Sequence, residues 1–202
     1  MIRLLVAAAL IAAASTAAPA APLTIVEVGA PAINCVFNPT CTIVVNDSAS
    51  PIPILTGTGA GFFQSRTFPP GVLGTPGAGK TAYVYRLDMR QAAGAFDCIG
   101  GLVMNFGPVT KLPYKPGFPP ADVFVITSGG IGTIGLKSAD QSGDIITFEF
   151  AKQICFDPAP DPKNTTFFFG LAATTPPKAI MVHIYKVGDP PFIELQARVP
   201  NH

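Results

Sequence analysis

This 202-residue chain has only two histidines, His183 and the C-terminal His202, as candidates for general acid–base chemistry. His183 lies in MVHIY, where strand alternation places it on the same face as Met181 and Tyr185. A hydrogen-bonded structural histidine is expected there, and His202 is expected to be frayed because it ends the chain. No catalytic residue is therefore assigned; if the protein is an enzyme, His183 is the candidate.

Serine and carboxylate chemistry have less local support. Ser128 could act as a nucleophile, but no G-x-S-x-G motif surrounds it. The 12 acidic residues could supply a carboxylate pair for glycan hydrolysis, but the sequence favours no particular pair.

Two glycine-rich segments match phosphate-binding motifs. GTPGAGKT at residues 74–81 fits the Walker A pattern, and GIGTIG at residues 130–135 fits G-x-G-x-x-G. The first motif requires a following helix, whereas here it leads into the strand-like AYVYRLDM. The second requires a crossover helix, but only LKSADQ separates it from Ser142 and Gly143. We interpret the first as a loop and the second as a hairpin or bulged turn, and we predict no nucleotide or other cofactor.

Acidic residues in two loops could ligate calcium. Asp140 and Asp144 offer oxygens in DQSGD, and Asp157 and Asp161 lie near Asn164 in a second polar loop. Neither loop has the glycine and distal glutamate of an EF-hand. Solvated loop polarity is the favoured interpretation, so no metal site is predicted and these four aspartates are the calcium candidates.

The four cysteines form an even set that suits disulfides in an exported protein. Three pairings are possible. We favour Cys35 with Cys41, because the intervening VFNPT contains Asn-Pro and suits a hairpin-like loop. That choice leaves Cys98 to pair with Cys155.

The N-terminus has the pattern of a secretory signal peptide at residues 1–20. Arg3 precedes an apolar segment at residues 4–14, and Ala18-Pro19-Ala20 fits the cleavage rule. The apolar segment is shorter than the ~20 residues that a membrane-spanning helix needs, and no later segment could span a membrane. Residues 21–202 are therefore expected to form one secreted or periplasmic domain.

Charge and composition exclude several partners. Without Arg3 the count of Lys and Arg falls from 13 to 12 and equals the 12 Asp and Glu. A neutral chain without a basic cluster lacks the electrostatic footprint of a nucleic-acid-binding or anionic-membrane-binding protein. The 49% hydrophobic content supports a core, and 22 Pro with 20 Gly interrupt nearly every apolar run.

Short apolar runs separated by turn residues predict roughly ten strands and little or no helix. The clearest are 81–90, with Tyr83, Tyr85, Leu87 and Met89 on one face, and 144–155, with Ile146, Phe148 and Phe150 on one face. Further strands are expected at 23–28, 41–46, 52–55 (at a sheet edge), 61–68, 98–106, 122–127, 166–171, 178–187 and 192–199, with a turn at 46–48 and loops at 68–80 and 111–120. This pattern predicts an all-β, disulfide-stabilised β-sandwich, with a jelly-roll-like arrangement as one possibility.

Aromatic residues suggest where a ligand could bind. The run Phe167, Phe168 and Phe169 is too continuous for a one-sided strand, so it is expected to serve two packing layers or one layer plus a cleft, and Gly170 is expected to end it. Four other aromatics stand beside Pro-rich loops and are the candidate binding residues, although each could instead pack against the core. They are Tyr114, Phe118, Phe156 and Phe192.

The segments TAYVYRLDMRQA, CIGGLVMNFGPV, DVFVITSGGIGTIGLKSA, GDIITFEF and FFFGLA, with Cys155, resemble a loose group of uncharacterised secreted bacterial proteins with an all-β body. The resemblance covers about residues 81–172, and FFFGLA and TSGG are its most distinctive parts. It implies an exported all-β protein and no particular activity.

The expectation for function is a secreted, non-catalytic binding or adhesion module for an extracellular glycan, matrix component or envelope partner. One alternative is a small extracellular hydrolase or isomerase acting on glycans through His183 and loop carboxylates. Another is a structural subunit that associates through open sheet edges.

Overall fold

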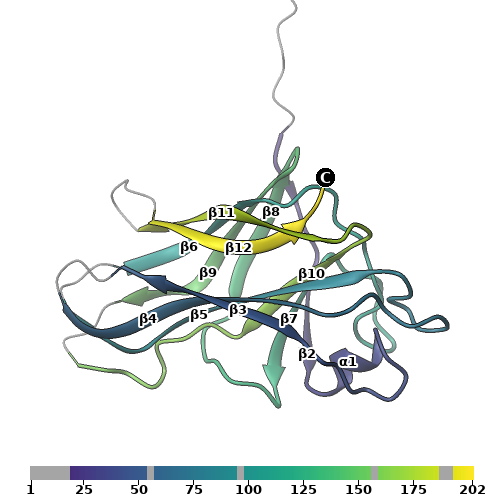
Figure 1. The fold of residues 1–202 in the computed structure, drawn as a ribbon, viewed down its shortest axis with the longest axis horizontal. Coiled ribbons are helices and arrows are strands. Elements are labelled where there is room, and N and C mark those ends of the chain that lie inside the picture. The colour runs from purple at the N-terminus through teal and green to yellow at the C-terminus, as the bar shows by residue number, and fades with distance from the viewer. Residues whose placement is uncertain (1–18, 54–56, 95–97, 156–158, 187–192) are drawn as a thin grey trace, which may run out of the picture.

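The computed structural model describes residues 19–53, 57–94, 98–155, 159–186 and 193–202. This part of the chain contains twelve strands and one short helix (Figure 1). In chain order the elements are β1 (Ala21–Pro22), β2 (Ile25–Gly29), α1 (Ala32–Cys35), β3 (Asn46–Ile52), β4 (Gly57–Thr67), β5 (Thr81–Gly94), β6 (Cys98–Asn105), β7 (Val123–Ser128), β8 (Leu136–Ser142), β9 (Ile145–Cys155), β10 (Phe168–Ala173), β11 (Pro177–Lys186) and β12 (Ile193–Pro200). The all-β prediction is confirmed. In the described residues no helix is long enough to span a membrane.

The strands form two sheets of six, which Figure 1 shows as two layers facing each other. The first sheet has the order β1-β8-β9-β6-β11-β12, and the second has the order β2-β7-β10-β5-β4-β3. Every pairing is antiparallel except that of β2 with β7. The edge position predicted for the apolar piece at 52–55 is confirmed for Ile52, which ends the edge strand β3.

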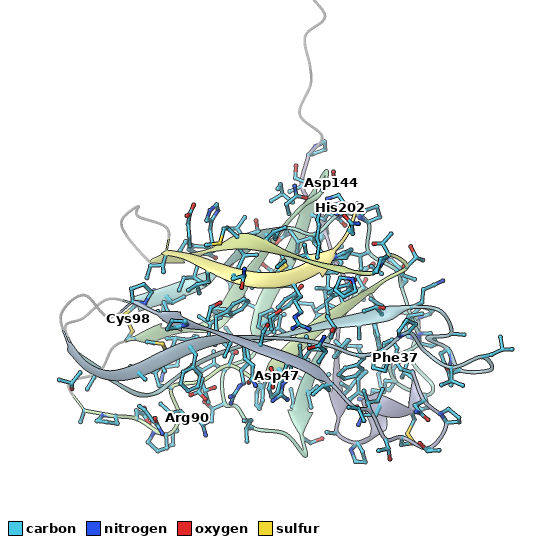
Figure 2. The ribbon with its side chains drawn as sticks, in the orientation of Figure 1. Phe37, Asp47, Arg90, Cys98, Asp144 and His202 are labelled. Atoms are coloured by element: carbon cyan, nitrogen blue, oxygen red, sulfur yellow. A yellow bond between two sulfur atoms is a disulfide. The ribbon has the colours of Figure 1, made fainter. Side chains whose placement is uncertain are left out.

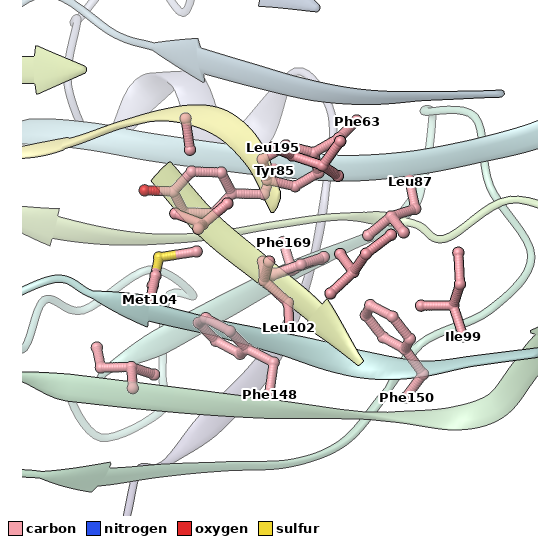
Figure 3. Close-up of a cluster of buried hydrophobic side chains, with 14 of the residues drawn as sticks. Phe63, Tyr85, Leu87, Ile99, Leu102, Met104, Phe148, Phe150, Phe169 and Leu195 are labelled. Carbon is pink, nitrogen blue, oxygen red and sulfur yellow. The ribbon is translucent and has the colours of Figure 1, made fainter. Parts of the chain in front are cut away.

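The main core lies between the two sheets (Figure 3). Phe148 and Phe150 of β9 and Phe169 of β10 meet there, with Phe148 and Phe169 ring centroids 5.0 Å apart. The period of two explains this placement, because alternate residues of a strand point to the same face. Tyr83 and Tyr85 of β5 also reach this core, as the alternation predicts.

A second apolar cluster covers the outer face of the second sheet. Val84, Phe124 and Phe168 come from β5, β7 and β10, and Ile33 of α1 and Phe37 after it pack over them. These three strands are therefore buried on both faces. The prediction that the phenylalanine run serves two layers is confirmed, since Phe168 and Phe169 belong to different clusters.

Two disulfides join the pairs that spacing favours. Cys35–Cys41 closes the turn that follows α1, and Cys98–Cys155 links opposing residues of β6 and β9. Figure 2 labels Cys98 at one end of the first sheet.

Two predictions around residue 46 are wrong. Residues 42–45 form no strand, and Asn46, Asp47 and Ser48 belong to β3 rather than to a turn. The ladder between β3 and β4 ends at the pair Asn46–Thr67, and β4 itself ends at Thr67, before Pro69 and Pro70. Residues 42–45 therefore have no strand to pair with.

Two further predictions need correction, and one strand was not predicted. Gly170 does not end β10, because it pairs with Val84 and with Phe124 and the strand continues to Ala173. Residues 130–135 are not a hairpin turn, since they connect β7 of one sheet to β8 of the other. The hairpin lies at Gly143 and Asp144, between β8 and β9, and β8 is a strand that the sequence pattern did not identify.

Candidate functional site

A hollow of about 410 Å³ opens on the outer face of the second sheet, beside the second apolar cluster. Its floor is made by side chains from four strands: Arg66 of β4, Val84 of β5, Ile126 of β7 and Phe168 of β10. Residues two positions apart in a strand point to the same side of the sheet, and each of these four residues is an even number of positions from other outward-facing residues of its strand. Their side chains therefore share one face. The sheet thus brings one cation and three apolar groups together.

The rim is built by α1 and by the glycine-rich segment after β7. Ile33 and Asn34 stand on one side, and Gly129, Gly130 and Ile131 on another. The Cys35–Cys41 disulfide and a hydrogen bond of 3.4 Å from Asn34 Nδ2 to the Cys41 carbonyl hold the turn that carries α1.

Gly129 allows the two rim segments to approach closely. Its φ of 68° suits glycine, and a Cβ at this position would collide with the Ala30 carbonyl oxygen. The Ala30 amide donates to the Ser128 carbonyl at 2.8 Å, which joins the segments on the two sides of the rim.

Two arginines lie against the same aromatic ring in the floor. The guanidinium carbons of Arg66 and Arg86 are 4.3 Å and 4.9 Å from the Phe168 ring centroid. Cations at this distance are attracted by the ring quadrupole. Phe168 therefore forms a platform for both guanidinium groups, of which only that of Arg66 lines the hollow.

Arg66 is only partly committed to protein partners. Its Nε donates to Asp47 Oδ2 at 2.9 Å, and Gln64 Nε2 donates to the same oxygen at 2.7 Å. The side chain remains 28% exposed. Among the described residues, neither terminal nitrogen of Arg66 makes a hydrogen bond.

Arg86 is buried in the same face and incompletely satisfied. Its Nε donates to Gln64 Oε1 at 3.1 Å, and its Nη2 lies 3.0 Å from Asp88 Oδ2. Its Nη1 is buried and has no hydrogen-bond partner in the described part of the chain. Burial lowers the pKa of Arg86, and the Asp88 carboxylate opposes that effect.

Asp88 joins Arg86 to Arg90. Arg90 donates from Nε to Oδ1 at 2.8 Å and from Nη2 to Oδ2 at 2.7 Å. The polar ladder defined by Asp47, Arg66, Arg86, Asp88 and Arg90 thus has three cations and two anions, one positive charge in excess. Figure 2 labels its two ends, Asp47 and Arg90, on the second sheet.

Two other hollows lie on this side of the molecule. One of about 460 Å³ shares Phe68 with the first and is lined by uncharged residues that include Pro69, Pro70 and Pro176. Another of about 250 Å³ is lined by Asp88, Arg90 and Gln91 of β5, with Phe62, Pro160 and Pro162 from other segments. The 460 Å³ hollow has no charged residue in its lining, and the Arg90 cation of the smaller hollow donates two hydrogen bonds to Asp88.

Of the four predicted aromatic binding residues, the structure describes Tyr114 and Phe118. Tyr114 is 2% exposed and packs against Phe124 with ring centroids 4.9 Å apart, so its assignment as an exposed binding residue is wrong. Phe118 is 53% exposed, and Lys115 Nζ lies 4.3 Å from its ring centroid. Phe156 and Phe192 lie outside the described residues.

The two histidines occupy different surroundings. His183 Nε2 lies 3.2 Å from Glu194 Oε1 on the neighbouring strand β12, and both side chains are largely exposed on the outer face of the first sheet. His202 is not frayed: its Nε2 lies 2.8 Å from Asn105 Oδ1, and its ring covers Gly107. Figure 2 shows His202 close to the β8–β9 hairpin, near Asp144.

Three of the four candidate calcium ligands lie in the described part of the chain. Asp140 lies in β8, Asp144 lies in the turn before β9, and Asp161 Oδ1 accepts from the Lys163 amide at 2.8 Å. Asp157 lies outside the described residues, and within the described ranges no three acidic, histidine or cysteine residues gather around a point. The Walker-like segment 74–81 is a loop that leads into β5, as predicted.

Sequence reasoning missed Arg66, Arg86 and Asp88 as a site. A signal existed, because the phenylalanine run indicated a cleft as one option and Phe168 does line the hollow. Comparison of the chain with protein-family models, curated proteins and solved structures found no match. Any function must therefore be inferred from this geometry.

Proposed function

We propose that this chain is a secreted or periplasmic, non-catalytic β-sandwich that binds a small ligand in the hollow on the outer face of its second sheet. Residues 21–202 would form this single domain, and a jelly-roll-like arrangement stays a prediction. The support for one domain is the main core, to which both sheets contribute.

Two disulfides support an oxidising compartment, because such bonds persist outside the cytoplasm. The leader-like sequence at residues 1–20, most of which lies outside the described residues, points the same way. Export through cleavage of that segment is part of the proposal.

One observation carries the proposal: an apolar hollow of about 410 Å³ with a cation in its floor. Small-molecule sites are typically ~300–1,000 Å³, mostly apolar, with a few polar groups that orient the ligand. Arg66 is such a group. No serine, cysteine, histidine or carboxylate lines this hollow among the described residues, which favours binding over catalysis.

The first experiment is a small-molecule screen of the oxidised protein by nuclear magnetic resonance, with the binding site mapped by amide shifts. We expect the shifts to cluster at Gly129, Gly130 and Ile131. Val45→Trp should block the hollow and weaken binding about tenfold or more, because Val45 lines it. Leu73→Trp is the matched control, since Leu73 is 93% exposed and is not part of the lining.

Shifts that cluster around His183 instead, or hits that bind Val45→Trp as tightly as the wild type, would refute this site. A glycan array tests the glycan version separately, with Phe118→Ala as the variant because Phe118 is the exposed one of the two candidates that the structure describes. Retention of a glycan that depends on Phe118 would move the proposed site to the loop of residues 115–118.

A further inference from the structure

The hollow contains an unused anion-binding group. Arg66 donates a hydrogen bond to Asp47 from its Nε, and its terminal nitrogens make no hydrogen bond among the described residues. A guanidinium edge presents two parallel N–H donors that match the geometry of a carboxylate. The Phe168 ring holds that group in place, so little freedom is lost when an anion binds.

Arg86 adds a second, independent indication. It is 4% exposed, lies on the same Phe168 ring and leaves its buried Nη1 without a hydrogen-bond partner in the described residues. An unsatisfied buried donor on a charged group is costly, and native proteins rarely keep one without a role. Arg86 is not part of the lining, so its charge would favour an anion bound at Arg66 without contacting it.

The charge balance of the ladder also favours a monoanion. Asp88 is shared by Arg86 and Arg90, and Asp47 accepts from both Arg66 and Gln64, so one positive charge is uncompensated. A single carboxylate would neutralise it. A cationic ligand would increase the excess.

The other residues that line the hollow determine what the uncharged part of the ligand can be. Apart from Arg66 and Asn34, the lining side chains are apolar or glycine, and Asn34 already donates to Cys41. A sugar or nucleotide would leave many polar groups unpaired there, at a cost for each. An aliphatic or aromatic body would bury apolar surface instead.

We propose that the hollow binds a small amphipathic carboxylate, with the anion on the Arg66 guanidinium beside Arg86 and the apolar body between Ile126, Val84 and the α1 rim. This inference rests on the proposed binding function and names its ligand class. Free carboxylic acids and the C-termini of apolar peptides share this chemistry.

Calorimetric titration with octanoate, octanol and octylammonium tests the class on the oxidised full domain. Octanoate should bind about tenfold or more tightly than octanol, and octylammonium should not compete. Acetyl-leucyl-leucine and its amide form a second pair. A preference for the dipeptide acid over octanoate would assign the peptide source, and the reverse preference would assign the free acid.

Substitutions of single charged residues test what each contributes to octanoate affinity. Arg66→Met should lower octanoate affinity about tenfold or more, and Arg66→Lys should recover only part of it because ammonium lacks the planar fork. Asp47→Asn should raise the affinity, since it removes the competing carboxylate. Lys152→Met is the control of equal charge change, because Lys152 is exposed on β9 of the first sheet.

The outcomes distinguish this inference from the proposed function. If octanol and octanoate bind equally and Val45→Trp abolishes both, the hollow is a binding site and the carboxylate assignment is wrong. If Arg66→Met binds octanoate like the wild type, the assignment is also wrong. If octanoate binds unchanged to Val45→Trp, both the assignment and the proposed site are overturned.

Discussion

Asp88 shows how one carboxylate organises the outer face of the second sheet. It is 2% exposed and lies between Arg86 at 3.0 Å and Arg90 at 2.7 Å. Burial alone would raise the pKa of Asp88, but hydrogen bonds from Arg90 and the charges of both arginines outweigh it and hold the pKa below the ordinary value. Asp88 is therefore ionised and paired with both arginines, which allows Arg86 to stay buried.

Asp88→Asn should destabilise the protein by about 3 kcal/mol at neutral pH, because it leaves Arg86 buried without its counter-ion. A lowered folded-state pKa contributes stability above the unfolded pKa of about 4, and this contribution disappears as pH falls through the folded pKa. The difference between wild type and variant should therefore narrow from about pH 5 toward pH 2. Urea unfolding at several pH values measures both effects.

Asp47→Asn is the matched control for this residue. Asp47 also pairs with an arginine, but its side chain is 36% exposed and the pair is screened by water. Its loss should cost less than about 1 kcal/mol. Two results would contradict the role given to the buried carboxylate. One is an equal loss of stability in the two variants. The other is a difference in stability between wild type and Asp88→Asn that stays constant down to pH 2.

The alternation in β5 predicted one face of this strand correctly and the other incorrectly. Tyr83, Tyr85 and Leu87 face the main core, as the period of two indicates. Arg86 and Asp88 look like solvent-facing residues in the sequence, yet both are buried. Their cover comes from distant segments, since Phe168 lies against Arg86 and Thr165 pairs with Asp88. Periodicity within one strand cannot show what packs over it.

At the scale of elements, segments with high β-propensity form strands only where a neighbouring strand is available to pair with them. Residues 42–45 are β-branched but lie beyond the end of β4, whereas polar Asn46, Asp47 and Ser48 pair with Thr67, Arg66 and Ser65. The Arg66–Asp47 ion pair strengthens that ladder. Register and charge pairing decided this edge, and neither can be seen in a single segment.

The two disulfides should stabilise their elements unequally. Cys98–Cys155 spans a sequence separation of 57 and Cys35–Cys41 one of 6. Constraint of the unfolded chain grows with loop length, to about 4 kcal/mol for the long loop and about 2 kcal/mol for the short one. We expect replacement of both Cys98 and Cys155 by alanine to lower the urea concentration at the midpoint of unfolding. The effect should be larger than that of replacing both Cys35 and Cys41.

The short disulfide has a second expected effect, because it lies beside the rim residues Ile33 and Asn34. Cys35→Ala with Cys41→Ala should weaken ligand binding in the hollow, whereas the substitutions at Cys98 and Cys155 should lower stability and leave affinity unchanged. Reversed effects on stability would show that native packing, rather than loop length, sets the contribution of each bridge.

At the scale of the molecule, two tyrosines tie the sheets together. Tyr85 of β5 donates its hydroxyl to the Arg198 carbonyl in β12 at 2.7 Å, and Tyr83 donates to the Thr175 carbonyl at 2.7 Å. Ser65 accepts from the Arg198 amide at 2.9 Å at the same corner. The sequence predicted the two tyrosines as core residues, but not these bonds, because they depend on how the sheets stack.

Alkaline titration should report on this packing. The chain has four tyrosines and no tryptophan, so tyrosinate absorbance can be measured without interference. Burial raises the pKa of Tyr83, Tyr85 and Tyr114, and burial followed by Glu149 raises that of Tyr185. A raised folded-state pKa means that stability is full below the unfolded value of about 10 and declines above it, by about 1.4 kcal/mol per pH unit for each tyrosine.

We therefore expect little tyrosinate near pH 10 and a cooperative rise at higher pH that coincides with loss of the far-ultraviolet strand signal. Tyr185→Phe should remove the earliest part of the rise, because Tyr185 lies on the outer face of the first sheet and is only partly buried. Tyr85→Phe should make the stability less sensitive to pH above 10 while lowering it by about 1 kcal/mol at neutral pH, since the Arg198 carbonyl loses its donor. Ionisation of all four tyrosines near pH 10 with the sheets intact would contradict the packing of the two sheets around Tyr83 and Tyr85.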